Sequence, residues 1–200
     1  MSNIVLASKS PRRKDLFDIL AINYSLITAE INEEILANES PTSAAIRIAT
    51  SKAKAVAKIA PLDSIIISAD TIVVCNGIIL GKPNNKQEAF DFLTMLSGKS
   101  HKVMTGICLY NLNTNIIETE LVTTLVYFRN LTSSEIDSYI NTKEPYDKAG
   151  GYGIQGKGAL LVERIEGCYY NVVGLPLVSL YKMLAKQGVN LLGSVNDGGV

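Results

Sequence analysis

The sequence predicts an α/β fold built on a long mixed sheet, and three observations support this class. Short apolar runs typical of buried strands alternate along the chain with segments of helical periodicity. No segment repeats at a fixed period, which excludes a solenoid or a propeller. The chain has 200 residues, 47% of them hydrophobic, so it can bury a sizeable core. We therefore expect residues 1–192 to form one domain, either a single body or one sheet elaborated into two lobes.

The first third of the chain predicts two strands and two helices. Ser10 is a good N-cap and Pro11 suits the first turn of a helix, and Ser40 with Pro41 repeats this pattern. Apolar runs mark the strands that precede each helix. The expected elements are strands at 4–7 and 24–27 and helices at 12–20 and 41–60.

The remainder of the chain predicts a hairpin, further strands and three more helices. Asn76-Gly77 is the strongest short hairpin signal, and Thr132 with Glu135 forms a capping box. Asn85 with Glu88 caps another helix in the same way. The expected strands lie at 64–69, 72–75, 78–80, 101–110, 121–128 and 160–165, and the helices end near residues 96, 141 and 186. Residues 193–200 are small and polar, so a loose tail is expected there.

Composition excludes several classes of partner. Nineteen basic and nineteen acidic residues give a net charge of zero, so no global field would hold a nucleic acid polymer or an anionic membrane. Neither a membrane span nor an export signal is visible. Three widely spaced cysteines fit reduced thiols in the cytoplasm. The single histidine, His101, cannot supply a histidine-based zinc site, and beside Lys102 at a strand start we expect it to point to solvent.

Arg12 and Arg13 conflict with their predicted position. The first turn of a helix carries partial positive charge, which disfavours a cation by about 0.3 to 1 kcal/mol. Either both arginines turn outward into solvent, or they join Ser8 and free backbone N–H groups around a phosphate-bearing ligand.

Lys52 is similarly out of place in the helix expected at 41–60. A helical projection puts it in the middle of an apolar stripe, whose members are Ala45, Ile48, Ala49, Val56 and Ile59. The lysine either extends along its neighbours to reach water, or ends in a cleft whose ligand offsets its charge.

Further polar residues follow the buried strands. Asp70 comes directly after the run 64–69, at the carboxyl end of a core strand, where ligands of open α/β sheets lie. An aspartate there can equally serve only as a turn-former. Thr71 adds a hydroxyl beside it, and Lys82 follows the hairpin. Glu33 is a weaker carboxylate candidate in a polar loop.

Residues 147–158 hold five glycines. They either let the backbone approach a ligand closely or form bulges between strands. The segment matches neither the P-loop nor the Rossmann fingerprint. Gln155, whose amide both donates and accepts hydrogen bonds, is the residue there best suited to read the edge of a base.

Taken together, six segments resemble the Maf family of nucleoside triphosphate pyrophosphatases, which is related in fold to the inosine triphosphate pyrophosphatases. They occur in family order and span most of the chain. The matching segments are 6–13, 69–73, 81–83, 96–106, 147–156 and 171–176. One departure is Asn32, which stands where the family often has an acidic residue.

The resemblance implies an elongated α/β fold with a central nucleotide cleft, in a cytoplasmic homodimer that uses Mg or Mn. The reaction splits a nucleoside triphosphate between its α and β phosphorus atoms, giving a monophosphate and pyrophosphate. Asp70 would be the proton acceptor and, with Glu33, a metal ligand. The phosphate-binding residues would be Ser8, Arg13, Lys52 and Lys82.

The resemblance also implies a substrate. In the branch that prefers dTTP and UTP, the serine-proline is followed by two arginines and the glycine-rich segment carries glutamine, as Arg12, Arg13 and Gln155 do here. Arg12, Thr71 and Gln155 would then set specificity, and the role would be sanitation of the nucleotide pool. Two alternatives stay open: the branch that prefers 7-methyl-GTP, and a nucleotide-binding regulator of septum formation without significant turnover.

Overall fold

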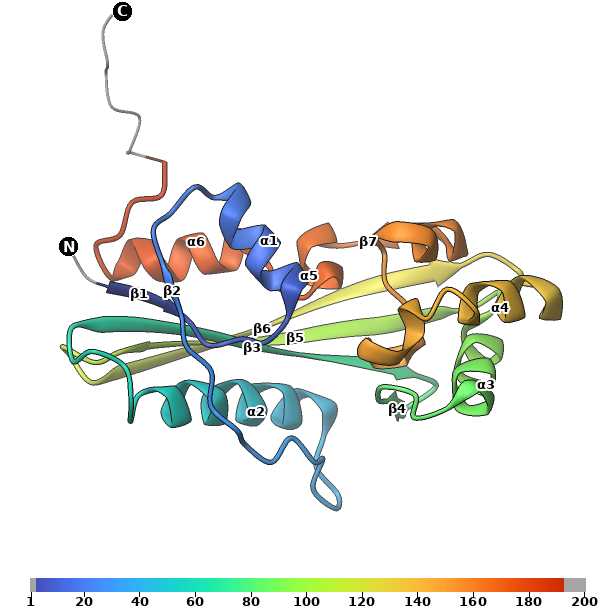
Figure 1. The fold of residues 1–200 in the computed structure, drawn as a ribbon, viewed down its shortest axis with the longest axis horizontal. Coiled ribbons are helices and arrows are strands. Elements are labelled where there is room, and N and C mark those ends of the chain that lie inside the picture. Colours follow the sequence, from blue (N-terminus) through green and yellow to red (C-terminus); the bar gives the residue numbers. More distant parts are fainter. Residues whose placement is uncertain (1–2, 193–200) are drawn as a thin grey trace, which may run out of the picture.

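A seven-stranded mixed sheet runs the length of the molecule (Figure 1), in the order β2-β1-β3-β5-β6-β7 with β4 paired to the far part of β3. The computed structural model describes residues 3–192, so the tail expected at 193–200 lies outside the described residues. The strands are β1 (Asn3–Leu6), β2 (Ser25–Leu26), β3 (Ser64–Cys75), β4 (Ile78–Leu80), β5 (Ser100–Asn111), β6 (Ile116–Phe128) and β7 (Val162–Glu166). The α/β class with a mixed sheet is confirmed.

Helices cover both faces of this sheet. α2 lies on one face, and α1, α5 and α6 lie on the other (Figure 1). The α-helices are α1 (Pro11–Ile19), α2 (Pro41–Val56), α3 (Lys86–Leu96), α4 (Ser133–Ile140), α5 (Tyr169–Val173) and α6 (Leu177–Lys186). Three 3₁₀ helices are η1 (Glu144–Asp147), η2 (Ala149–Gly151) and η3 (Gly156–Leu161). The predicted caps Ser10, Ser40, Asn85 and Thr132 all accept a hydrogen bond from the first turn of their helix.

The central strand β3 is longer than the sequence predicts. We expected separate strands at 64–69 and 72–75, but pairing with β5 continues through Asp70, opposite Gly106, and Thr71, opposite Thr105. Each of these residues has a strand partner, so the ladder is not interrupted by the polar pair. The expectation that Asp70 ends a strand is therefore wrong: it lies in the middle of one.

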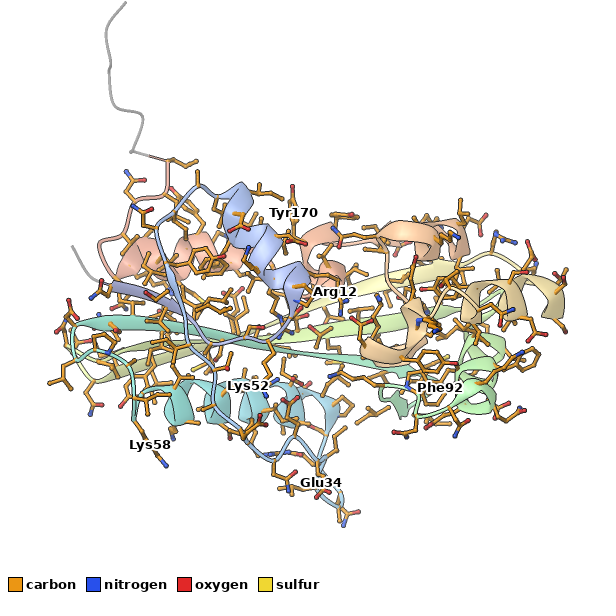
Figure 2. The ribbon with its side chains drawn as sticks, in the orientation of Figure 1. Arg12, Glu34, Lys52, Lys58, Phe92 and Tyr170 are labelled. Carbon is orange, nitrogen blue, oxygen red and sulfur yellow. The ribbon has the colours of Figure 1, made fainter. Side chains whose placement is uncertain are left out.

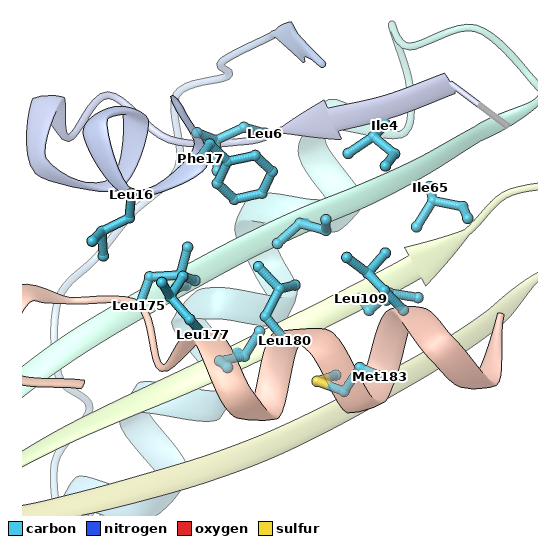
Figure 3. Close-up of a cluster of buried hydrophobic side chains, with 14 of the residues drawn as sticks. Ile4, Leu6, Leu16, Phe17, Ile65, Leu109, Leu175, Leu177, Leu180 and Met183 are labelled. Carbon is cyan, nitrogen blue, oxygen red and sulfur yellow. The ribbon is translucent and has the colours of Figure 1, made fainter. Parts of the chain in front are cut away.

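Successive residues of β3 pack into different hydrophobic clusters, because side chains in a strand alternate between the two faces of the sheet. Ile65 packs with Phe17 of α1 and with Leu180 of α6 (Figure 3), and Ile67 belongs to the same cluster. Ile66 packs on the other face against the apolar stripe of α2. That stripe is as predicted except for Ile59, which is 63% exposed because α2 ends at Val56.

One edge of β3 is shared between two short strands. β1 pairs in parallel with β3 only as far as Ile67, and β4 pairs with it only from Val73. Neither strand pairs with the stretch between them, which contains Asp70 and Thr71. The stretch of β3 that carries Asp70 and Thr71 therefore has no strand beside it on this edge.

Candidate functional site

A cleft of about 520 Å³ opens at this interrupted edge of β3. Every site residue predicted from the sequence lines it, although they come from six separate parts of the chain. These residues are Ser8, Arg12, Arg13, Glu33, Lys52, Asp70, Thr71, Lys82 and Gln155. The fold therefore brings the whole predicted set together.

Lys52 connects the two predicted carboxylates. Its Nζ lies 2.7 Å from Oδ1 of Asp70 and 3.1 Å from Oε2 of Glu33. The Lys52 and Asp70 side chains are only 15% and 13% exposed. Lys52 lies on α2, whereas Lys58, beyond the end of that helix, projects away from the body (Figure 2). Of the two interpretations of Lys52, the structure selects the side chain that ends in the cleft.

Gly106 lets α2 come close enough for this contact. A Cβ at Gly106 would lie 2.6 Å from the carbonyl oxygen of Ala45 on α2, closer than real Cβ atoms come. Gly106 is also the strand partner of Asp70. Because position 106 is a glycine, α2 can pack closely on β5 beside Asp70. This packing places Lys52 of α2 near the Asp70 carboxylate.

Arg13 does not turn outward into solvent. It is 8% exposed, and its Nε donates to the carbonyl oxygen of Gly174 at 2.7 Å, while Nη1 donates to that of Ala69 at 2.8 Å. Nη2 donates to Oγ1 of Thr71 at 3.0 Å. Burial lowers the pKa of Arg13 from its ordinary value, and the nearby Asp70 carboxylate opposes that change. These bonds account for an arginine in the first turn of a helix.

Arg12 reaches across the cleft to the glycine-rich segment. Its Nη1 lies 2.6 Å from Oδ2 of Asp147, and Lys148 lies 2.6 Å from the other oxygen of the same carboxylate. Sequence reasoning gave neither Asp147 nor Lys148 a role. Their position after a proline-containing turn carries no periodic signal that could have indicated one.

Thr71 does not lie beside Asp70 as expected. The Asp70 side chain faces Lys52 of α2, whereas the Thr71 hydroxyl contacts Arg13 of α1. Neighbouring residues of a strand point to opposite faces, so the two line different walls of the cleft. The sequence prediction missed this alternation because it placed residues 70 and 71 between two strands rather than within one.

A sequence profile described as "Maf-like protein" matches residues 3–187, which is most of the chain. The chain belongs to the Maf family.

Relatives of known name agree with this assignment. A dTTP/UTP pyrophosphatase of Syntrophomonas wolfei is 50% identical over 187 residues, which is 94% of this chain and 98% of the relative. A second dTTP/UTP pyrophosphatase, of Clostridium botulinum, is 45% identical over 96% of this chain and 100% of the relative. Among solved structures, the Staphylococcus aureus Ham1 protein covers 94% of this chain and 100% of its own, at 16% identity and a TM-score of 0.49.

The glycine-rich segment of this Maf protein packs against the hairpin. Gly150 donates its N–H to the carbonyl oxygen of Gly81, and a Cβ there would lie 2.9 Å from Val73. Its φ of +70° also favours glycine. Lys82, next to Gly81, and Gln155, within the segment, are exposed and line the cleft. The glycines thus allow close packing of one protein segment on another.

His101 does not point to solvent. It is 2% exposed, its Nε2 shares a 2.5 Å hydrogen bond with the hydroxyl of Tyr152, and its ring packs edge-on against Phe128. Its Nδ1 is buried without a hydrogen-bond partner. The expectation failed because the glycine-rich segment, distant in sequence, folds over the start of β5.

The stability of this Maf protein is expected to fall in acid because of His101. Burial lowers the pKa of His101 from 6.5 to about 4. The unfolded chain therefore binds a proton first as the pH falls, so stability is lost between pH 6.5 and pH 4, by about 3 kcal/mol. Urea unfolding of wild type and His101→Gln across this range measures the effect. Since the chain has one histidine, the two curves should differ in slope only there, and equal slopes would contradict the prediction.

Proposed function

We propose that this Maf protein hydrolyses dTTP and UTP to the monophosphate and pyrophosphate, and so removes these or related modified pyrimidine nucleotides from the pool. The names of the two relatives from Syntrophomonas wolfei and Clostridium botulinum support the activity. The observation that carries it is the meeting, in one cleft, of a carboxylate, Asp70, with the Lys52 ammonium and the Arg13 guanidinium. Hydrolysis of a phosphoanhydride needs a base for water and fixed cations for the developing charge.

Asp70 is proposed as the base that accepts a proton from the attacking water. Lys52 holds one carboxylate oxygen, Oδ1, at 2.7 Å. That bond fixes the orientation of the carboxylate and leaves Oδ2 free of any protein hydrogen bond within the described residues. A fixed orientation is what a base needs to direct water at the α phosphorus.

The phosphates are proposed to bind Ser8, Arg13, Lys52 and Lys82. A guanidinium has five N–H groups and Arg13 commits three to the protein, so two are left for an anion. Lys52 likewise commits two of its three N–H groups to Asp70 and Glu33. These cations would offset charge on the triphosphate and on the departing pyrophosphate.

A divalent cation fits this set of residues. Within residues 3–192, no group of three or more His, Cys, Asp or Glu side chains could hold a metal ion. Mg²⁺, however, is ordinarily held by one or two carboxylates together with substrate phosphates and water. Glu33 and Asp70, joined through Lys52, are proposed as those carboxylates, and the bound ion would supply charge that the lysines and arginine cannot supply alone.

Gln155, Arg12 and Thr71 are proposed to set base specificity. The amide of Gln155 can accept from N3–H and donate to O4 of uracil or thymine, whereas the 7-methyl-GTP alternative would favour a carboxylate. Gln155→Glu is expected to lower kcat/KM for UTP by about fivefold or more, because a carboxylate cannot donate to O4 and one hydrogen bond to the base, worth about 1 kcal/mol, is lost. The exposed Gln87→Glu on α3 is the control for the same substitution. Equal values for wild type and Gln155→Glu would remove Gln155 from the specificity set.

Hydrolysis of UTP in ¹⁸O-labelled water, followed by phosphorus NMR, tests the reaction. Attack at the α phosphorus puts the label in UMP and leaves pyrophosphate unlabelled. Label in pyrophosphate would contradict the proposed site of attack. Binding of UTP without turnover would instead support the alternative, a nucleotide-binding regulator of septum formation.

The setting is proposed to be the cytoplasm. Cys75, Cys108 and Cys168 are all free thiols, the first two of them buried. In the part of the chain that the structure covers, no helix is long and apolar enough to cross a bilayer.

A homodimer, expected from the family resemblance, stays a prediction that sedimentation analysis can check.

A further inference from the structure

A chain of buried hydrogen bonds leads from the cleft into the sheet. Arg13 Nη2 donates to Thr71 Oγ1 at 3.0 Å, and this oxygen lies 2.9 Å from Oγ1 of Thr105 on β5. Thr105 Oγ1 donates in turn to the main-chain carbonyl oxygen of Asn171 on α5, at 3.1 Å. Thr105 and Asn171 are fully buried. The chain thus joins α1, β3, β5 and α5.

Counting donors fixes the direction of every bond in this chain. A carbonyl oxygen only accepts, so the single proton of the Thr105 hydroxyl is committed to Asn171. Between the two threonines, Thr71 must therefore donate its own proton to Thr105. The Thr71 oxygen then has only lone pairs to offer, and one of them receives the Nη2–H of Arg13.

Because the Thr71 hydroxyl donates to Thr105, it can act only as an acceptor toward Arg13. If the Thr71 proton could rotate toward Arg13, two donors would face each other and the Nη2 bond would be lost. The commitment to Thr105 prevents this rotation. The other end of the same guanidinium is held by the carbonyl oxygen of Gly174, which immediately follows α5, three residues after Asn171. The α5 segment therefore fixes Arg13 directly, through Gly174, and indirectly, through Thr105 and Thr71.

We infer that Thr105 is a positioning residue for the reaction: it orients the Thr71 hydroxyl as an acceptor and thereby holds the Arg13 guanidinium toward the triphosphate. It also leaves Thr71 able to accept, but not to donate, a hydrogen bond to the nucleotide. Thr105 is the strand partner of Thr71, and within the described residues it has no hydrogen bond to Ser8, Arg13, Lys52 or Lys82. The expected change in kcat/KM rests on the proposed function. The expected change in the position of Arg13 does not.

The first test compares two buried threonines. Thr105→Val removes the hydroxyl, so the Asn171 carbonyl oxygen keeps only the N–H of Gly174 as a donor. Thr124→Val is the matched control, because Thr124 is equally buried, donates to the carbonyl oxygen of Cys168 and accepts from Nδ2 of Asn171. It therefore also contacts α5, but it has no hydrogen bond to Thr71 or Arg13. Both variants should lose similar thermal stability. Only Thr105→Val should lower kcat/KM for UTP by about ten- to a hundred-fold, and Thr105→Ser should restore it.

The second test asks whether the effect passes through Thr71. In a Thr71→Val background, Thr105→Val should cause no further loss of kcat/KM, because the hydroxyl that it orients is gone. Effects of the two substitutions that multiply would overturn the inference. So would equal losses in Thr105→Val and Thr124→Val.

A third readout needs no turnover. The Nε–H of Arg13, assigned as the arginine signal that disappears in Arg13→Lys, should exchange slowly with solvent in wild type and in Thr124→Val. In Thr105→Val the exchange should be about tenfold faster or more, since each 1.4 kcal/mol of lost protection is a factor of ten. Unchanged exchange would overturn the inference. A wild-type protein that protects this N–H but hydrolyses no nucleotide would refute the proposed function alone.

Discussion

Replacing Asp70 by asparagine is expected to lower kcat for dTTP and UTP by about 10² to 10⁴-fold while the protein still folds and binds nucleotide. The amide is nearly isosteric with the carboxylate and its oxygen can still accept from Lys52, so the contact between β3 and α2 is kept. What is lost is basicity, and general-base catalysis contributes rate factors of this size.

Single-turnover kinetics, nucleotide binding and thermal unfolding measured on the same sample separate these effects. Asp91→Asn, on the surface of α3, is the control for the same chemical change outside the cleft. Activity of Asp70→Asn within a factor of two of wild type would sink the assignment of the base. A loss of activity that tracks a loss of folded protein would do the same.

Removing divalent cations is expected to abolish turnover. Two or three cationic side chains cannot offset the charge of a triphosphate in a partly buried cleft, and Glu33 with Asp70 adds negative charge to it. Lys82→Ala should weaken activity further at limiting Mg²⁺, because it removes one of the remaining cations from the cleft wall. The measurement is initial rate against added Mg²⁺ or Mn²⁺ after treatment with excess chelator. Undiminished turnover in the chelator would refute the metal requirement.

The sequence predicted the site best where a residue conflicted with its surroundings. Arg13 at a helix N-terminus and Lys52 on an apolar stripe are each unfavourable locally, and both conflicts are resolved by contacts in the cleft. Local rules detect such conflicts because helix position and periodicity are readable from neighbouring residues. They do not identify the partners, which for both residues include groups on β3.

The errors concern contacts between residues distant in the chain. The polar pair Asp70 and Thr71 was expected to end a strand, but pairing with β5 carries β3 through it. His101 was expected at the surface, but Tyr152 covers it. Thr105 lies in the family-like segment 96–106, but no local rule gave it a role, because one threonine in an apolar strand is common. Burial by a remote segment leaves no periodic trace in the local sequence.

The most direct test of the account is kcat/KM for pyrophosphate release by wild-type protein over a panel of dTTP, UTP, CTP, ATP and 7-methyl-GTP with Mg²⁺. We expect dTTP and UTP to be the preferred substrates, and each to give one pyrophosphate per monophosphate. Turnover of 7-methyl-GTP faster than that of UTP, or binding of the panel without release of pyrophosphate, would contradict the account.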